Sequence, residues 1–241
     1  MIPYSIFTNE GNRPVNEDRV GVAVYGANSY CFVLADGLGG HGSGEKAAQI
    51  AVDAVCSVFV ENGFSSSFFE KALNYAQDAI LAEQTHLNIP SRMKTTIVVL
   101  VISDKKAYCA HIGDSRLYFF KGGKMKRRTL DHSVPQALVL SKEIPEKNIR
   151  CHPDRNRLLK VMGVGGERAD YEEGKPVKLG RNTAFLLCSD GFWEPCEEKT
   201  MEETLKQSNS AEQWLEKMKQ HILGQSIADQ DNFSAIAVFP E

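Results

Sequence analysis

Five aspartates in this chain of 241 residues stand where strand-like apolar runs begin or end. Asp36 and Asp190 each close such a run and precede a glycine, in FVLADG and FLLCSDG, and Asp114 closes AHIGD. Asp18 and Asp231 stand just before two further runs. A single aspartate at a strand end is usually a turn former or a helix cap. Five of them at the strand ends of one sheet system indicate a shared site.

Carboxylates gathered at one sheet rim repel one another unless a cation neutralises them. Carboxylate and backbone carbonyl oxygens suit hard divalent cations such as Mg²⁺ and Mn²⁺. The six cysteines include no CxxC pair, and no Cys/His cluster has the spacing of zinc ligands. The residues therefore predict a Mg²⁺ or Mn²⁺ site rather than a zinc site.

A glycine-rich stretch, GLGGHG at 37–42, follows the first of these aspartates and lets the backbone approach a ligand closely. Its spacing also satisfies G-x-G-x-x-G, the dinucleotide-binding fingerprint. That fingerprint requires a βαβ unit, whereas here a second helical pattern follows the first and the next strand candidate begins only near Thr95. The acid at a suitable distance, Asp53, falls in the middle of a helix, so a dinucleotide site is disfavoured.

Cys151 and Arg157 have the C-x₅-R spacing with which a cysteine-based phosphatase wraps a phosphate. Such a loop needs an apolar strand before it and a helix N-terminus after it. The flanking residues here are EKNIR and LLK, and Pro153 removes a backbone donor. We therefore expect Cys151 to be an ordinary residue of its segment.

Runs rich in β-branched and aromatic residues predict the strands that must position these groups. They cover 4–7, 20–25, 30–35, 95–102, 107–112, 116–120, 184–188 and 233–239. One-faced helical patterns cover about 43–62, 66–86 and 211–223. The helices come back to back and the strands come in consecutive groups, which favours an α+β fold of antiparallel sheet with helices on its faces.

The chain contains no repeat and no long Pro/Gly/Ser linker, so we expect a single domain over 1–241. The stretch at about 134–157 is polar and holds three prolines between strand groups. It is interpreted as a surface insertion with short helices. The turn KGGK at 121–124 predicts a two-residue hairpin, because both glycines can take the positive φ of a primed turn.

The charge balance excludes some partners. Lys and Arg total 28 against 31 Asp and Glu, a formal charge of −3, which gives no electrostatic footprint for nucleic acid or an anionic membrane. The N-terminus lacks a basic segment followed by an apolar one, and the longest apolar run, 97–102, is far too short to span a bilayer. We expect a cytoplasmic protein.

Eight short motifs occur in the order found in one family, and the chain closely resembles the metal-dependent protein phosphatases of the protein phosphatase 2C type, in their bacterial stand-alone form. The motifs are RPVNED at 13–18, DGLGGH at 36–41, TT at 95–96, GDSR at 113–116, DHS at 131–133, HPDRN at 152–156, SDG at 189–191 and DN at 231–232. Each is weak alone, but together they cover nearly the whole chain.

The resemblance implies a four-layer α-β-β-α sandwich of two antiparallel sheets flanked by helices, with two Mg²⁺ or Mn²⁺ ions at the sheet rims. By position, Asp36 would bridge the ions and the Gly37 carbonyl would bind one of them. Asp190 and Asp231 would complete that side, and Asp18 would act mainly through water.

Three further roles follow from the same resemblance. Arg13 would bind the substrate phosphate, because a guanidinium can contact two phosphate oxygens at once and lysine cannot match that geometry. Asp114 would help Asp190 to hold a weaker third ion. The stretch at 134–157 would be the variable flap beside the active site.

The chemistry of such a site is hydrolysis without a covalent phosphoenzyme. Two divalent ions about 3.5 to 4 Å apart can share a water, lower its pKa and present it in line with the phosphorus. Animal relatives place a histidine directly after the Asp-Gly pair as the acid for the leaving alkoxide, whereas this chain has Leu38 there. His41, three residues further on, is then either a structural group near the ligands or the proton donor.

The expected activity is Mg²⁺- or Mn²⁺-dependent hydrolysis of phosphoserine and phosphothreonine in proteins, with a serine/threonine kinase as the opposing enzyme. Two alternatives stay open. One is an inactive relative that binds phosphoproteins or senses metal, which the complete set of aspartates together with Arg13 disfavours. The other is a phosphatase for a phosphoester that is not a protein.

Overall fold

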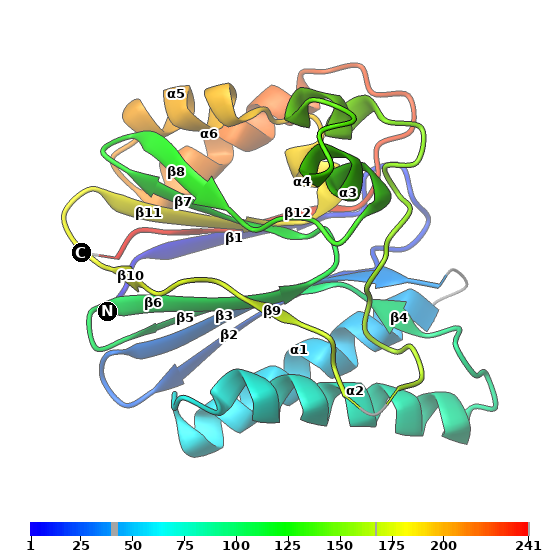
Figure 1. Ribbon diagram of the computed structural model, residues 1–241. Helices are drawn as coiled ribbons and strands as arrows, with labels where there is room; N and C mark the ends of the chain where they lie inside the picture. Colours follow the sequence, from blue (N-terminus) through cyan, green and yellow to red (C-terminus); the bar gives the residue numbers. More distant parts are fainter. Residues whose placement is uncertain (40–42, 167, 241) are drawn as a thin grey trace.

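Two antiparallel sheets lie face to face between two layers of helices in the computed structural model, which describes residues 1–39, 43–166 and 168–240 (Figure 1). The smaller sheet has five strands in the order β1-β12-β11-β7-β8. Its strands are β1 (Tyr4–Asn9), β12 (Phe233–Val238), β11 (Thr183–Cys188), β7 (Arg116–Lys121) and β8 (Lys124–Arg128). Because β1 and β12 pair, the first and last strands of the chain lie side by side.

The larger sheet has seven strands, five of them in the order β10-β6-β5-β3-β2, while β4 pairs with β3 and β9 with β6. Its strands are β2 (Asp18–Tyr25), β3 (Ser29–Leu38), β4 (Lys94–Thr95), β5 (Ile97–Ser103), β6 (Lys106–Ile112), β9 (Glu172–Glu173) and β10 (Val177–Lys178). The strand β5, IVVLVIS, is apolar and buried up to its last residue, Ser103, because helices cover one face and the other sheet covers the second.

Helices cover the outer face of each sheet (Figure 1). The larger sheet carries α1 (Ser43–Asn62) and α2 (Phe68–His86), and the smaller sheet carries α4 (Asp190–Trp193), α5 (Glu198–Lys206) and α6 (Ala211–Leu223). Between β8 and β9 lie α3 (Val134–Leu140) and the 3₁₀ helix η1 (Glu146–Cys151). The predicted four-layer α+β sandwich is confirmed.

Small residues let α1 lie close to the sheet and to α2. Ala47, Ala48 and Ala51 are fully buried, at the spacing of one helix face. At the start of the helix the approach is closest, because a Cβ added at Gly37 would lie 2.3 Å from the backbone of Gly44. This packing fixes the end of β3 against the first turn of α1, beside the aspartate that precedes Gly37.

The predicted elements agree with the structure apart from the shortest and most polar ones. The 43–62 and 211–223 helices have the predicted bounds, and Gly122 and Gly123 take φ values of 62° and 71° in the hairpin. The pattern missed β9 and β10, which have two residues each, the single turn of α4, and α5. In α5 only Met201 is buried, so hydrophobic periodicity gives almost no signal there.

Short helices form in the predicted insertion, as expected. An antiparallel bridge between Ser133 and Leu158 marks where the chain leaves and returns, and both α3 and η1 lie within it. Its role as a flap and the single-domain reading of 1–241 stay predictions. Within the described ranges, no helix has both the length and the hydropathy needed to cross a membrane.

Candidate metal centre

Four of the five predicted aspartates line one cavity of about 640 Å³ at the rim of the two sheets. They are Asp36, Asp114, Asp190 and Asp231, and the same cavity is lined by two other predicted site residues, Arg13 and Gly37. The fifth aspartate, Asp18, is 2% exposed and does not line the cavity. The chain thus brings together groups that lie up to 218 residues apart.

The register of β2 and β3 places two of these carboxylates directly opposite one another. Asp18 pairs with Asp36 across the antiparallel ladder, so their side chains project from the same face. Like charges at directly opposed positions destabilise a sheet. This arrangement therefore costs stability unless a positive charge binds there.

Two threonines hold the backbone of Asp36 in place. The carbonyl oxygen of Asp36 accepts hydrogen bonds from the Thr96 N–H and the Thr95 hydroxyl, both at 2.8 Å. The Asp36 N–H in turn donates to the Thr96 hydroxyl at 3.1 Å. Because β3 leaves β5 at this point and pairs with β4, these bonds replace the ladder and orient the carboxylate.

A serine links the two sheets behind the cavity. The Ser189 hydroxyl donates to Oδ2 of Asp18 at 2.7 Å and accepts from the Ser234 N–H at 3.0 Å. Ser189 directly precedes Asp190, the first residue of α4. The hydrogen bond from Ser189 therefore connects the Asp18 carboxylate, in the larger sheet, to the chain beside Asp190, a predicted metal ligand.

Burial and mutual repulsion raise the pKa values of the aspartates. The pKa of Asp36 lies well above its ordinary value because of burial and then the charges of Asp190, Asp18, Asp114 and Asp231. Burial followed by the charge of Asp114 does the same for the pKa of Asp190. Burial raises the pKa of Asp18 to about 6 and that of Asp114 to about 7. Without a cation, the ionised form of this group is unfavourable.

These shifts predict how the metal-free protein responds to pH. The pKa of Asp18 is about 6 in the folded protein, which lies above that of an unfolded aspartate. Protonated Asp18 therefore makes its full contribution to the free energy of unfolding below about pH 4, and this contribution is lost as the pH rises through 6. We expect Asp18→Asn to stabilise the metal-free protein at pH 7.5 by about 2 to 3 kcal/mol, and to change little at pH 4. Urea unfolding in EDTA at the two pH values measures this, and equal stability of variant and wild type at pH 7.5 would contradict it.

The Arg13 guanidinium is engaged in an ion pair, whereas its predicted role in binding the substrate phosphate requires it to be free. Its Nε and Nη2 donate to the two carboxylate oxygens of Asp231 at 2.9 and 3.0 Å. Both side chains are about two-fifths exposed. The sequence did not predict this ion pair, which engages both oxygens of a predicted metal ligand.

Among the described residues, the only set of three or more potential ligand side chains with all ligand atoms within 4.8 Å of one another is His111, His132 and Glu172. No three of the described aspartates therefore bring their ligand atoms within that distance of one another, and Asp231 faces Arg13. For Asp231 to join Asp36 and Asp190 around a cation, its pair with Arg13 must open.

Two residues that sequence reasoning left without a role belong to this site. Glu17 lines the cavity, burial raises the pKa of its carboxyl group, and its Oε1 is buried with no hydrogen-bond partner. The Asn232 amide donates to the carbonyls of Glu10 and Val15 and accepts from the Glu17 N–H at 2.8 Å. Glu17 lies in the RPVNED motif next to Asp18, and Asn232 lies in the DN motif next to Asp231.

Trp193 of α4, the helix that packs on the smaller sheet, holds the backbone of Asp114 in place. The Asp114 backbone carbonyl accepts a hydrogen bond from the indole N–H of Trp193 at 3.0 Å, and Asp114 is 5% exposed. Leu38 also lines the cavity, and so do Asn156 and Leu158 from the end of the insertion. His41 lies outside the described residues.

The two rival phosphate and nucleotide sites find no support in the geometry. Asp53 lies in α1 and accepts a hydrogen bond from Gln49 on the same helix, and the strand pairings among the described residues are all antiparallel, so α1 is not part of a βαβ unit. Cys151 ends η1 on the surface, and its thiol faces the carbonyl of Asn148 rather than a ring of amides.

The donor set of the cavity fits hard divalent cations. It offers carboxylate oxygens and the Gly37 backbone, with no sulfur or described imidazole in the lining. Oδ1 of Asp18 and Oε1 of Glu17 are buried without a partner, which is costly for an oxygen that carries charge. A bound cation would remove this cost and the repulsion among the aspartates.

Comparison with known proteins identifies the family of this chain. A family model described as protein phosphatase 2C matches residues 9–231. The chain is 29% identical over 198 residues to a serine/threonine phosphatase, stp, of Listeria monocytogenes, a match that covers 79% of this chain and 77% of that protein. The chain belongs to the protein phosphatase 2C family.

Solved structures agree. The serine/threonine phosphatase PstP/Ppp of Mycobacterium tuberculosis matches with a TM-score of 0.88 and 25% identity, over 100% of this chain and 99% of that one. The catalytic domain of PstP in complex with 2 manganese ions matches with a TM-score of 0.82 over 98% of this chain and 97% of that one. The second match has 24% identity and supports the fold assignment alone.

Proposed function

We propose that this protein hydrolyses phosphoserine and phosphothreonine in other proteins, with two Mg²⁺ or Mn²⁺ ions held at the aspartate-lined cavity. The observation that carries the proposal is the gathering of Asp36, Asp190, Asp114 and Asp231 around one cavity without a fixed countercharge for most of them. Family membership and the manganese complex of a related catalytic domain support a dependence on divalent metal.

Each ligand candidate has a distinct part in the proposal. Asp36 would hold both ions, the Gly37 carbonyl would bind one of them, and Asp190 and Asp231 would complete that side. Asp18, which is buried behind the cavity, acts through water. Asp114 and Asp190 together hold a weaker third ion. When bound, the two ions supply an activated water and neutralise charge on the phosphate.

Arg13 changes partner in this proposal. In the free protein its guanidinium forms two hydrogen bonds with Asp231. Once Asp231 turns to a cation, the same planar pair of N–H groups is free to contact two phosphate oxygens. The residue thus orients the phosphoester and stabilises charge that grows on its oxygens. Cation binding at Asp231 and phosphate binding at Arg13 favour one another.

The change of partner predicts a gain of metal affinity when the guanidinium is removed. We expect Arg13→Gln to tighten Mn²⁺ binding up to about fivefold, because an exposed ion pair is worth about 0.2 to 1 kcal/mol, and to weaken inhibition by inorganic phosphate. Calorimetry without phosphate measures the first effect. Arg13→Lys keeps the charge but loses the two-pronged contact, so its Mn²⁺ affinity should fall between the two. Weaker Mn²⁺ binding by Arg13→Gln would contradict this account.

Proton donation to the leaving alkoxide has no side-chain candidate at Leu38. His41 keeps its two alternative roles, as a structural group near the ligands or as the donor. A serine/threonine kinase as the opposing enzyme and placement in the cytoplasm stay predictions.

The substrate class can be tested by direct competition among phosphoesters. With Mn²⁺ present, we expect kcat/KM for phosphoserine and phosphothreonine peptides to exceed that for the matched phosphotyrosine peptide and for p-nitrophenyl phosphate. A preference for a small phosphoester would support the non-protein alternative. Binding of phosphopeptide without turnover would support the inactive relative.

A further inference from the structure

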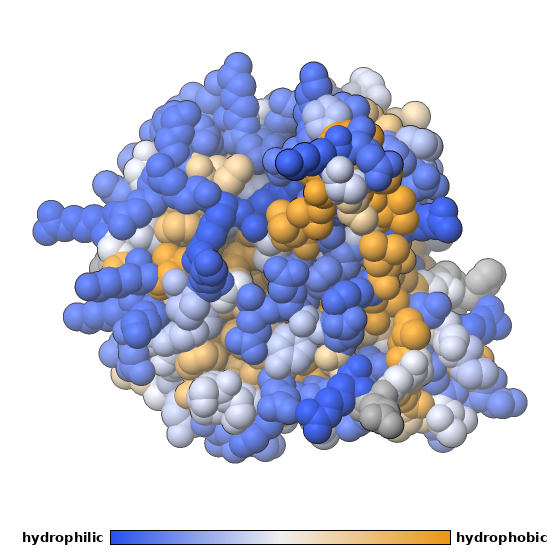
Figure 2. All heavy atoms as spheres, in the orientation of Figure 1, coloured by the Kyte–Doolittle hydropathy of each residue, from blue (hydrophilic) through white to orange (hydrophobic). Residues whose placement is uncertain are grey.

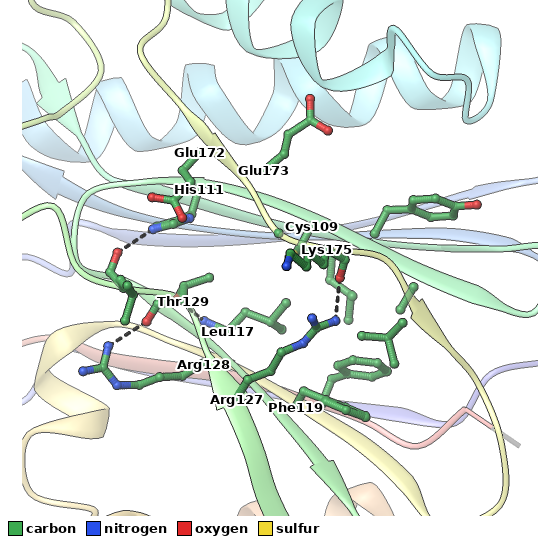
Figure 3. A pocket seen from close by; sticks show the side chains of 17 residues that line it. Cys109, His111, Leu117, Phe119, Arg127, Arg128, Thr129, Glu172, Glu173 and Lys175 are labelled. Atoms are coloured by element: carbon green, nitrogen blue, oxygen red, sulfur yellow. Dashed lines mark hydrogen bonds between the residues drawn. The ribbon is translucent and has the colours of Figure 1, made fainter.

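A second cavity, of about 300 Å³, opens between the edges of the two sheets and shares no lining residue with the aspartate site (Figure 3). It lies between β7 and β8 of the smaller sheet and β6, β9 and β10 of the larger one. Figure 2 shows apolar atoms exposed among polar ones on this face, near where Figure 1 places β10. Its volume is that of a site for a small organic molecule.

The interior of this cavity is the open end of the core between the sheets. Leu100, Leu117 and Phe185 belong to that core and also line the cavity, with Phe119 packed against them. The rings of Phe119 and Phe185 stack with centroids 5.4 Å apart. A flat apolar ligand would continue this packing and cover the part of Phe119 that is exposed to water, since Leu100, Leu117 and Phe185 are at most 6% exposed.

One end of the cavity carries a buried hydrogen-bond acceptor with no partner. The His111 ring is 2% exposed, and its Nε2 donates to the carbonyl of Leu130 at 2.7 Å. In the neutral ring this leaves a lone pair on Nδ1, which is buried and makes no hydrogen bond. Burial lowers the pKa of His111, in keeping with a neutral ring. The unmet acceptor favours a ligand with an N–H or O–H donor.

The charges at the mouth favour an uncharged ligand. Arg127, Arg128 and Lys175 line the cavity together with Glu172 and Glu173, and Arg128 is already paired with Asp131 and Glu146. Arg127 reaches from β8 to the other sheet, where it donates to the carbonyl of Lys175, and its guanidinium lies 5.7 Å from the centre of the Phe119 ring (Figure 3). An aromatic ring bound in the cavity beneath Arg127 would contact the same guanidinium through a cation–π interaction.

A metal ion is a poorer occupant, although His111, His132 and Glu172 have ligand-like spacing. The two imidazoles stack with a 10° angle between their planes, and in-plane lone pairs on parallel rings do not converge on one ion. The Gly113 N–H also donates to Nδ1 of His132 at 3.1 Å. The neutral ring then carries its proton on Nε2, the atom nearest Glu172, where a metal would need a lone pair.

We propose that this cavity binds a small, uncharged aromatic molecule with one hydrogen-bond donor, whose ring packs on Leu117 and Phe119 and whose donor meets Nδ1 of His111. This site is separate from the aspartate cavity and does not depend on the proposed phosphatase activity.

Indole and benzofuran test the proposal with the full chain, because they share a bicyclic shape and only indole has an N–H donor. In amide NMR titrations we expect indole to give saturable shifts confined to β6, β7, β9 and their neighbours, and to bind more tightly than benzofuran. His111→Phe should weaken indole binding about three- to tenfold and abolish its advantage over benzofuran. A cavity that holds only water would give no saturable shift up to the solubility limit, which would overturn the proposal.

A second pair of variants guards against a folding defect in His111→Phe. Val177→Phe adds bulk on β10 at the cavity wall, and we expect it to abolish binding of both probes. Val24→Phe makes the same change at an exposed position on β2 outside the cavity and should bind as the wild type does. Indole binding that survives Val177→Phe, or that is lost equally in Val24→Phe, would place the probe elsewhere and refute the assignment.

Discussion

Asp36→Asn is expected to lower the turnover of a phosphothreonine peptide by more than about a thousandfold. Losing a single hydrogen-bond donor to a transition state costs about 10²- to 10³-fold, and here one substitution removes a full charge from the carboxylate that is proposed to hold both ions. The neutral amide also avoids burying a charge and relieves the repulsion from Asp190 and Asp18, the effects that raise the pKa of Asp36 in the wild type. The variant should therefore fold at least as stably as the wild type without metal.

The matched control is Asp53→Asn, the same change on the exposed face of α1, where the carboxylate accepts a hydrogen bond from Gln49. Its activity should equal that of the wild type. Steady-state assays in saturating Mn²⁺ compare the two. Undiminished turnover of Asp36→Asn would remove the basis for a metal centre at this cavity.

Arg116→Met is expected to destabilise the protein by about 3 to 5 kcal/mol, the usual cost of removing one partner from a buried ion pair. The Arg116 side chain is 2% exposed and donates to both oxygens of Asp131 at 2.8 and 2.6 Å. Its guanidinium also lies 3.4 Å from the centre of the Trp193 ring. Methionine fills part of the volume but leaves the Asp131 charge in the interior.

Urea unfolding measures this effect, with Arg168→Met as the control. Arg168 pairs with Glu70 on the surface, where both side chains are more than half exposed, so its loss should cost less than about 1 kcal/mol. Arg116→Met combined with Asp131→Leu should recover part of the lost stability, because the unpaired charge is gone. A loss below about 1 kcal/mol for Arg116→Met alone would show that Arg128, which already donates to Asp131 at 3.3 Å, is enough to neutralise this carboxylate.

The aspartate site could be predicted from the sequence because strand ends mark it. Asp36 closes an apolar run and Asp18 opens one, and an antiparallel hairpin between those runs places them opposite each other. The bounds of α1 and α6 followed from one-faced periodicity. The four layers followed from the order of these elements together with the family resemblance.

What the sequence did not predict depends on contacts between distant residues. The Arg13 and Asp231 pair joins positions 218 residues apart, and no local pattern encodes it. Glu17 is one of two adjacent acids, and only its burial distinguishes it from an exposed side chain. The second cavity arises where two sheet edges meet, so its lining comes from strands that no motif connects.

The site also trades stability for function. Asp18 and Asp36 oppose each other with their pKa values raised, and hydrogen bonds from Ser189, Thr95 and Thr96 hold them there. Residues that were selected for stability alone would not place like charges across a ladder. A bound cation would turn the repulsion between these two carboxylates from a cost into a stabilising contact.

The central claim is that the aspartate-lined cavity works only with divalent metal. The most direct test is to strip the wild-type protein with EDTA, remove the chelator, and measure phosphate release from a phosphothreonine peptide as Mn²⁺ is added. We predict no turnover at the start and a saturable rise with Mn²⁺. Full turnover by the stripped protein before any Mn²⁺ is added would contradict the account.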